Sequence, residues 1–349
     1  MRRWVYLAKR LVLAVPVVLF GTSLTFLLLY AGPVNPAASI LGQGATPAEI
    51  ARLEAQLGLN EPLWSQYLEF MTGVLTFGLG ESYVISPNTG VYAVILDYAP
   101  RTLWMGFWAV LLPLFVGIPL GFYAGLHPNT PADYVASLGG IVWRAMPNFW
   151  LAVVLMTALS RSGAITGGAF AWGTWLVETT VVGAPPLDGL VTWTGLVPSV
   201  DAHQFLVALK MTLPASVVLG SASMGNEMRI ARTAMLEAKH ANYVELARAK
   251  GVSGRAIVWK HVFRNALVPL IPVISAEAFL LVGGSVLVEY VFGINGIGYL
   301  FFRAMTQGDI PLAGALMFVF IVIVVGMNVV QDLLYTLVDP RVGYDGHRP

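Results

Sequence analysis

The 349-residue chain lacks cysteine, and only 11% of its residues carry a charge. Without cysteine there is no disulfide framework, no thiolate metal site and no lipidated cysteine. Hydrophobic residues make up 57% of the chain, which is more apolar surface than a soluble core of ordinary size can bury. These features predict an integral membrane protein that is embedded in a lipid bilayer.

Motifs for nucleotide, metal or covalent chemistry are missing as well. The nearest approach to a phosphate-binding GxxxxGK[ST] loop, Gly73 to Gly78, is followed by Leu79. The five histidines do not form i, i+4 pairs, and no grouping of Ser, His and Asp suggests a nucleophile. We therefore expect a protein that is not an enzyme, with no cofactor, no metal and no nucleic acid as a partner.

Six apolar runs are long enough to cross about 30 Å of hydrocarbon, which takes roughly 20 residues. They are Leu11 to Ala31, Leu103 to Leu126, Tyr134 to Leu159, Phe205 to Gly225, Ala266 to Phe292, and Pro311 to Leu337. The first run is too long for a cleaved signal and has no small-x-small site after it. The pattern predicts an all-α membrane protein with six transmembrane helices.

The positions of the basic residues predict the orientation of these helices. Fourteen of the twenty Lys and Arg residues lie before the first run, between the fourth and fifth, or after the sixth. By the positive-inside rule that side faces the cytoplasm, and an even number of spans brings both termini there. The net charge of +1 says nothing further about partners.

Two segments are expected on the opposite, external side. The first, Gly32 to Arg101, contains a helix start in which Thr46 is the N-cap, Pro47 the first helical residue and Glu49 the reciprocal partner. Gly58 is expected to end this amphipathic helix. The second, Ser160 to Gln204, contains Gly, Pro and Trp, which suits either the headgroup interface or contact with a soluble partner.

The same pattern divides the chain into three regions. Residues 1–101 would hold the first span and the external segment with its short helix. Residues 102–337 would form a five-helix core that includes a cytoplasmic loop at 226–265, and residues 338–349 a cytoplasmic tail. We find no internal repeat, which a transporter made of two repeated halves would show.

The cytoplasmic loop is the most informative part of the sequence. Eight of the twenty Lys and Arg residues lie between Arg229 and Arg264. Helix-forming residues run from Met235 to Lys250 without a breaker, Gly251 and Gly254 allow a sharp turn, and a second basic helix is expected from Arg255 to Arg264. We predict a helical hairpin with Tyr243, Leu246 and Ala247 on one side. The alternative is a basic loop held against anionic lipid headgroups.

The run ELARAKG followed by KHVFRNALVP, within Met235 to Pro269, closely resembles the cytoplasmic loop of membrane subunits in ATP-binding-cassette importers. The similarity is to the oligopeptide and dipeptide (peptide/nickel) permease group, and it extends over nearly the whole chain. RLEAQLGLNEPLWSQY after the first span and LVEYVFGINGIGYL, DIP and LLYTLVDPRV near the C-terminus are similar to that group too.

The resemblance implies a type I ABC importer permease fold and a multi-pass protein of the cell membrane. It also implies four kinds of contact: a second homologous permease subunit, two cytoplasmic ATPase subunits, an external substrate-binding protein and the lipid bilayer. The helix around the family's Glu-Ala-Ala signature would be the coupling helix, with Glu245 pairing with a basic residue of the ATPase. The residues so implied for ATPase coupling are Tyr243, Glu245, Ala247, Lys250 and Gly251.

The sequence departs from the family pattern on the external side. Gly32-Pro33-Val34-Asn35-Pro36 stands where the family usually has Gly-Asp-Pro, and Phe77-Gly78-Leu79-Gly80 where it has Gly-Asp-x-Gly. The usual external contacts are therefore in question. The implied cargo is di- or oligopeptides, while nickel, sugars and a self-sufficient secondary transporter stay open as alternatives.

Two charged residues fall inside predicted spans, Arg144 in the third and Glu277 in the fifth. At 1.5 Å per residue both lie roughly 15 Å deep, where charges are costly and usually face the interior of a bundle. We expect that they form an ion pair or line the translocation pathway together. The alternative is that Arg144 reaches the interface and Glu277 is protonated.

Overall fold

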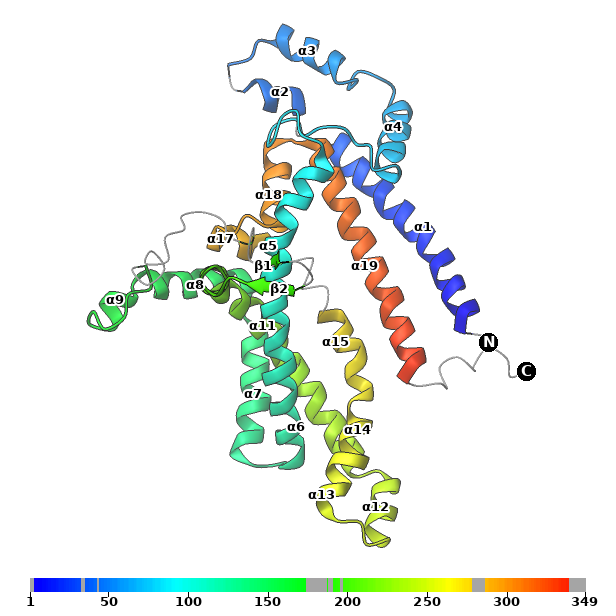
Figure 1. The fold of residues 1–349 in the computed structure, drawn as a ribbon. Helices are drawn as coiled ribbons and strands as arrows, with labels where there is room; N and C mark the ends of the chain where they lie inside the picture. Colours follow the sequence, from blue (N-terminus) through cyan, green and yellow to red (C-terminus); the bar gives the residue numbers. More distant parts are fainter. Residues whose placement is uncertain are drawn as a thin grey trace. The chain divides into compact units, whose positions relative to one another are not determined.

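A computed structural model describes residues 3–32, 35–42, 44–173, 187, 191–194, 197–277 and 286–338 (Figure 1). These residues are helical apart from loops and one two-stranded β-hairpin, as expected for an all-α protein. The chain divides into two compact units, which we describe separately. The first unit contains the described residues between 103 and 294 and from 330 to 338, and the second those before 103 and from 295 to 329.

The first unit contains the C-terminal part of α5 (Val91–Leu112) and the last residues of α19 (Ile310–Val338). Its other elements are η1 (Pro113–Gly117), α6 (Ile118–Leu126), α7 (Pro131–Ala145), α8 (Asn148–Ser160), α9 (Ser162–Ile165), β1 (Val191–Thr194), β2 (Val197–Val200), α11 (Ala202–Lys239), α12 (Asn242–Ala249), α13 (Gly254–Ala256), η2 (Ile257–Val262), α14 (Phe263–Ala266), η3 (Val268–Leu270), α15 (Ile271–Glu277) and α17 (Val286–Phe292). Strands β1 and β2 pair antiparallel, with Val191 opposite Val200.

The second unit contains the remaining parts of α5 and α19. Its other helices are α1 (Arg3–Tyr30), α2 (Pro36–Leu41), α3 (Pro47–Gln56), α4 (Leu63–Leu75) and α18 (Ile297–Gln307). The division of the sequence at residues 101 and 337 stays a prediction.

Five helical stretches of the described chain are long and apolar enough to cross a membrane. They are Leu7–Tyr30, Val91–Leu126, Ala202–Lys239, Gly254–Ile274 and Ile310–Leu334. Two bent pairs, α7 with α8 and α17 with α18, raise the number to seven if each pair is one span. The predicted six spans fall within this range, and the second span begins at Val91 rather than at Leu103.

The predicted third span, Tyr134 to Leu159, is not one continuous helix. Helices α7 and α8 meet at an angle of 96°. Pro147 disfavours helical geometry at the preceding residue, and Met146 indeed has an extended conformation with φ −83° and ψ 126°. The apolar run was long enough for a span, but the proline within it sets a sharp corner.

The fourth predicted span also differs from the structure, and part of the fifth lies outside the described residues. Helix α11 does not stop at Gly225 but continues to Lys239, because nothing in the intervening sequence breaks it. Its 38 residues extend for about 57 Å at 1.5 Å per residue, well beyond a hydrocarbon core of about 30 Å. Of the fifth span, Ala266 to Phe292, residues 278–285 lie outside the described part of the chain.

In the second unit the helix predicted to start at Thr46 is confirmed as α3, while its external position stays a prediction. The Thr46 side chain accepts a hydrogen bond from the Glu49 backbone N–H at 3.3 Å, and the Glu49 carboxylate accepts one from the Thr46 N–H at 2.8 Å. These bonds from the backbone and side chain of Thr46 lower the pKa of Glu49. Gly58 follows the helix with a φ of +70°, so the predicted end is confirmed as well.

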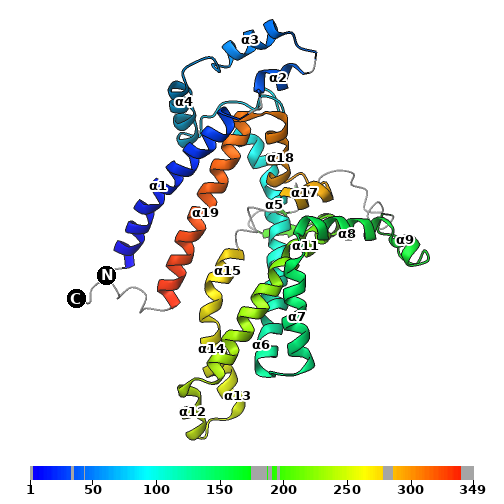
Figure 2. The same ribbon diagram turned by 180° about the vertical axis from the view of Figure 1, so that it is seen from behind.

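A line of glycines holds α6 against α11 in the first unit, and both ribbon views show the two helices running side by side (Figures 1 and 2). Gly117, Gly121 and Gly125 recur every fourth residue and therefore share one face. A Cβ at Gly125 would lie 2.7 Å from the Arg232 carbonyl oxygen, and one at Gly121 would overlap that of Met228. This small-xxx-small pattern lets the two backbones touch, as is typical of membrane helices.

We predict that Gly121→Ala destabilises the protein, because the new methyl group meets a backbone oxygen that cannot move aside. Overpacking of this kind costs about 1–3 kcal/mol, which exceeds the gain of about 1 kcal/mol from replacing a helical glycine by alanine. The midpoint of thermal unfolding in mild detergent measures the effect. Gly326→Ala is the matched control, because a Cβ at that helical glycine meets nothing within 4 Å. Equal midpoints for the two variants would contradict the packing.

Candidate functional site

The α12 hairpin, which we define as residues 240–266, lies at the C-terminal end of α11 (Figure 1). Helix α12 ends at a turn in which the Gly251 N–H donates to the Arg248 carbonyl at 2.9 Å and the Val252 N–H to the Ala247 carbonyl at 3.1 Å. Gly251 has a φ of +76°, a conformation that glycine adopts without strain. The predicted turn at Gly251 is confirmed.

The predicted uninterrupted helix from Met235 to Lys250 is wrong. Helix α11 ends at Lys239, and Ala241 is extended with φ −74° and ψ 144° before α12 begins. No glycine or proline causes this break. It lets Val244 and Ala247 of α12 pack into the same cluster as Ala234, Met235 and Ala238 of α11. Burying the apolar residues of α12 in the same core as those of α11 overrides the local preference for a continuous helix.

Helix α12 has one buried and one exposed face. Val244 is 0% exposed and Ala247 7%, whereas Tyr243 is 40% and Leu246 57% exposed. Ala247 therefore faces the interior of the hairpin, and the expectation that it shares a side with Tyr243 and Leu246 is wrong. The exposed face combines those two apolar side chains with charged ones, which are Glu245, Arg248 and Lys250.

The second arm of the α12 hairpin is helical, as predicted for Arg255 to Arg264, but it is not a regular α-helix. Between α13 and α14 the six residues of η2 form a π-helix. Ile257 and Val262 of this segment pack into the cluster that holds Val244 and Ala247. The two arms thus share one core with the end of α11, and α12 is fixed to both.

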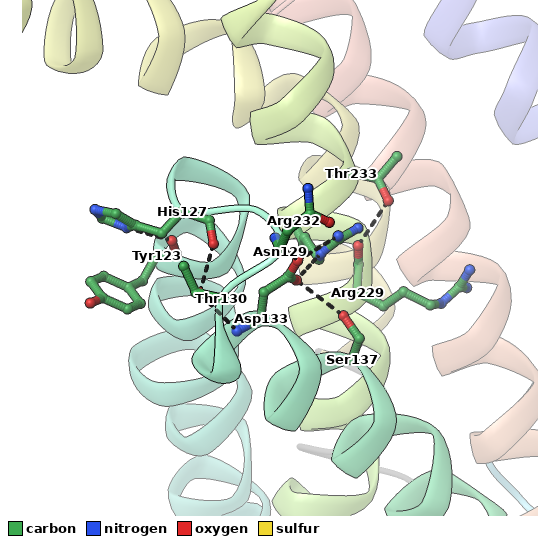
Figure 3. Close-up of polar contacts among 9 residues, drawn as sticks. All are labelled: Tyr123, His127, Asn129, Thr130, Asp133, Ser137, Arg229, Arg232 and Thr233. Carbon is green, nitrogen blue, oxygen red and sulfur yellow. Dashed lines mark hydrogen bonds and ion pairs between the residues drawn. The ribbon is translucent and has the colours of Figure 1, made fainter.

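An ion pair between α7 and α11 supports the same end of the first unit (Figure 3). The Arg232 guanidinium binds the Asp133 carboxylate through Nε and through Nη2, the latter at 2.8 Å. Asp133 also accepts from the Asn129 N–H at 2.9 Å and from Ser137 at 3.3 Å. Thr130 is the N-cap of α7, as predicted, so Asp133 fastens the start of this helix to α11.

A second basic residue of α11 binds the end of α6. The Lys239 ammonium donates to the Leu126 carbonyl at 3.0 Å, where the last carbonyls of α6 lack partners within the helix. Lys239 and Arg232 therefore hold the turn between α6 and α7 from two points. The turn between α6 and α7 is therefore attached to the part of α11 that leads into the α12 hairpin.

We predict that Asp133→Asn lowers stability by about 2 kcal/mol or more, because it breaks a largely desolvated, multiply hydrogen-bonded pair. The Asp133 side chain is 3% exposed. Asp97→Asn is the matched control, since Asp97 also pairs with an arginine but is 67% exposed, and such pairs contribute about 1 kcal/mol or less. Thermal unfolding in mild detergent compares them, and an equal loss for both would refute a special role for Asp133.

Of the two charged residues predicted inside the membrane, only Arg144 has a described side-chain contact. The Arg144 guanidinium donates to the Asn226 side-chain oxygen of α11 at 2.8 Å. Glu277 ends α15, but its side chain lies outside the described part of the chain, so its pairing with Arg144 stays a prediction. Asn226 gave no signal in the sequence, because it is a single amide at the boundary between the fourth apolar run and the basic loop.

In the second unit a buried carboxylate organises the loop before α5. Asp309 is 0% exposed and accepts hydrogen bonds from the Ser82 hydroxyl at 2.5 Å and from the Tyr83, Val84 and Ile85 N–H groups, each at 3.1 Å. Burial, with Glu69 and Asp309 nearby, raises the pKa of Tyr83. Asp309 belongs to the DIP run that carried the family resemblance, and its role is to fasten this loop to the start of α19.

We predict that Asp309→Asn increases amide hydrogen exchange at Tyr83, Val84 and Ile85 by about tenfold or more. An amide offers one acceptor oxygen where the carboxylate offers two, so N–H groups of the loop lose their partner. Exchange measured by mass spectrometry on the detergent-purified protein reports this directly. Asp201→Asn, at the N-cap of α11, is the matched control and leaves these three amides unchanged. If exchange is also unchanged in Asp309→Asn, the hydrogen bonds to the Asp309 carboxylate do not hold the loop.

Comparison with known protein families identifies the chain. The family model described as "Binding-protein-dependent transport system inner membrane component" matches residues 117–344, and its N-terminal companion matches residues 3–106. The chain belongs to this family. The α12 hairpin, α11 and the glycine line of α6 all lie in the longer match, and this membrane component is a multi-pass protein of the inner membrane.

Relatives of this membrane component are similar along almost their whole length. It is 31% identical to the dipeptide transport system permease protein DppB of Alkalihalophilus pseudofirmus, over 97% of this chain and 99% of that protein. It is 30% identical to the oligopeptide transport system permease protein AppB of Bacillus subtilis, over 97% and 99%. The chain is also similar to a solved inward-facing structure of the MetNI methionine ABC transporter. The match covers 71% of this chain and 97% of the solved chain, with 19% identity and a TM-score of 0.47.

Proposed function

We propose that this membrane component is the permease subunit of an ATP-binding-cassette importer that carries di- or oligopeptides into the cytoplasm. The observation that carries the proposal is its full-length similarity to permeases named for dipeptide and oligopeptide transport. Nickel and sugars are less favoured, because these relatives are named for peptides. The chain acts as the pathway and not as an enzyme, with ATP hydrolysed on two separate cytoplasmic subunits.

The partners follow from the same proposal. A second homologous permease completes the pathway, and an external binding protein delivers the peptide, as the name of the family implies. The exposed face of α12 is the ATPase dock. Tyr243 and Leu246 supply its apolar contact, while Glu245 and Lys250 supply charges that can pair across the interface. Ala247 and Gly251 act indirectly, the first by anchoring α12 in the core and the second by shaping the turn.

The anchoring explains how force would pass from the ATPase into the membrane. Because Val244 and Ala247 are buried with Met235 of α11 and Val262 of the second arm, a push on α12 moves these segments together. Arg232 and Lys239 then carry the displacement of α11 to the turn between α6 and α7. Motion of packed helices as a body is one recognised route between alternative transporter states.

We predict that Gly251→Asp and Glu245→Lys each abolish peptide uptake and release the ATPase subunits, while the chain still inserts in the membrane. The first forces a non-glycine residue to a φ of +76°, and the second reverses the charge of the dock. A pull-down of the tagged chain in mild detergent, with retained proteins identified by mass, measures the loss. Wild type is expected to retain two ATPase subunits, a second permease and the binding protein.

Gly168→Asp is the matched control for this experiment. Gly168 also has a positive φ, of +87°, and a Cβ there meets nothing within 4 Å, but it lies in the loop after α9. This variant should retain the ATPase subunits as wild type does. If the wild-type chain is recovered without partner proteins and still supports uptake, the importer assignment fails and assignment as a secondary transporter takes its place.

A further inference from the structure

Two arginines of the first unit share one amide at the contact between α7 and α11. The Asn226 side-chain oxygen accepts from Arg144 at 2.8 Å and makes a longer contact of 3.5 Å with Arg229. The close approach of the helices makes this possible. Gly140, one turn before Arg144, lies against Gly225, and a Cβ added at Gly140 would come within 3.2 Å of the Gly225 carbonyl oxygen.

The charge of this pair is not neutralised by the part of the chain that the structure describes. Both arginines are exposed, and neither forms an ion pair with a described carboxylate. Arg229 points away from the Asp133 carboxylate, which binds Arg232 (Figure 3). Glu227, which follows Asn226, is 1% exposed. An amide oxygen positions two guanidinium groups but leaves their charges in place, so the pair is complementary to an anion.

An apolar groove of about 400 Å³ lies between α6, α7 and α11. Neither arginine lines it, but Gly140 of its lining is one helical turn before Arg144, and Met228 directly precedes Arg229. Helices α6, α7 and α11 line it with side chains that include Leu120, Val135, Trp143, Met224 and Met228. Trp143 and Gly225, which line the groove, directly precede Arg144 and Asn226 in the chain. The positively charged pair of arginines and the apolar groove are therefore neighbours in the first unit.

We propose that Arg144 and Arg229, held by Asn226, bind the free carboxylate of a peptide in transit, and that the groove receives the adjacent apolar side chain. This inference rests on the proposed function and assigns the chemistry that the pathway recognises. Each guanidinium can donate a charge-assisted hydrogen bond to the carboxylate.

The depth of the site favours a peptide over an anionic lipid headgroup. Arg144 lies eleven residues after Asp133, where α7 enters its candidate membrane span, and this corresponds to roughly 16 Å along the helix. A lipid phosphate lies at the membrane surface, whereas charged side chains at greater depth usually face a water-filled cavity or another charge. A peptide that crosses the membrane must pass this depth.

The experiment uses the assembled transporter in vesicles of neutral phosphatidylcholine. The chain has no cysteine, so Thr233→Cys places one thiol on the exposed side of α11, one turn beyond Arg229. We expect an anionic methanethiosulfonate to modify it about tenfold faster than a cationic one, because of the two nearby positive charges. The ratio should fall close to one in Arg144→Gln with Arg229→Gln, and should be unchanged by the exposed control Arg161→Gln. A thiol that neither reagent reaches would overturn the proposal.

Peptide specificity is tested with Ala-Ala-Leu and its C-terminal amide. The free acid should slow modification of the thiol at least threefold and the amide should not, and Arg144→Gln should abolish this protection. Equal protection by both peptides would overturn the inference, as would protection that requires added anionic phosphatidylglycerol. An anionic preference that appears only after Glu277→Gln would show that Glu277 occupies the site, and would overturn it too.

Uptake measured in the same vesicles separates this inference from the proposed function. If wild type imports peptides but the free acid gives no selective protection, the carboxylate site is wrong and the importer stands. If wild type imports no peptide, the proposed function fails, and the carboxylate site fails with it.

Discussion

The first unit depends on the direct backbone contact between α6 and α11. Inside a bilayer the lipid tails are as apolar as the side chains, so burying leucine gives little reason for two helices to associate. Close packing must supply that reason, and Gly117, Gly121 and Gly125 allow it by presenting no side chain toward α11. A third helix, α7, joins through the equally close pair Gly140 and Gly225. Helix α11 is thus the common support for its neighbours.

Polar contacts are concentrated where these helices end or change direction. Arg232 and Lys239 hold the turn between α6 and α7, and Arg144 meets Asn226 just before the corner at Pro147. In the second unit Asp309 plays a comparable part for the loop at residues 82–85. Apolar packing sets how close the helices lie, while these polar contacts fix which residues face each other. Because a few polar contacts are enough to fix the facing residues, a chain with so few charges can still have specific helix contacts.

Much of the local structure could be predicted from neighbouring residues. The cap of α3 at Thr46, the cap of α7 at Thr130 and the turn at Gly251 were all confirmed, because each depends on chemistry within a few positions of the chain. The corner at Pro147 was also readable in principle, but the length of the apolar run concealed it. The end of α11 at Lys239 was not readable, since the residues around His240 form helices well on their own.

The sequence alone determined that this is a helical membrane protein with a basic helical hairpin, because composition, apolar run length and capping residues act locally. Only the tertiary structure decided that Ala247 faces inward, that Arg232 binds Asp133, and that Arg144 meets Asn226 and shares it with Arg229. The contacts of Arg232 with Asp133 and of Arg144 with Asn226 join residues far apart in the chain. They depend on how closely the helices approach, and that distance is set by glycines whose effect appears only once their partner helix is known.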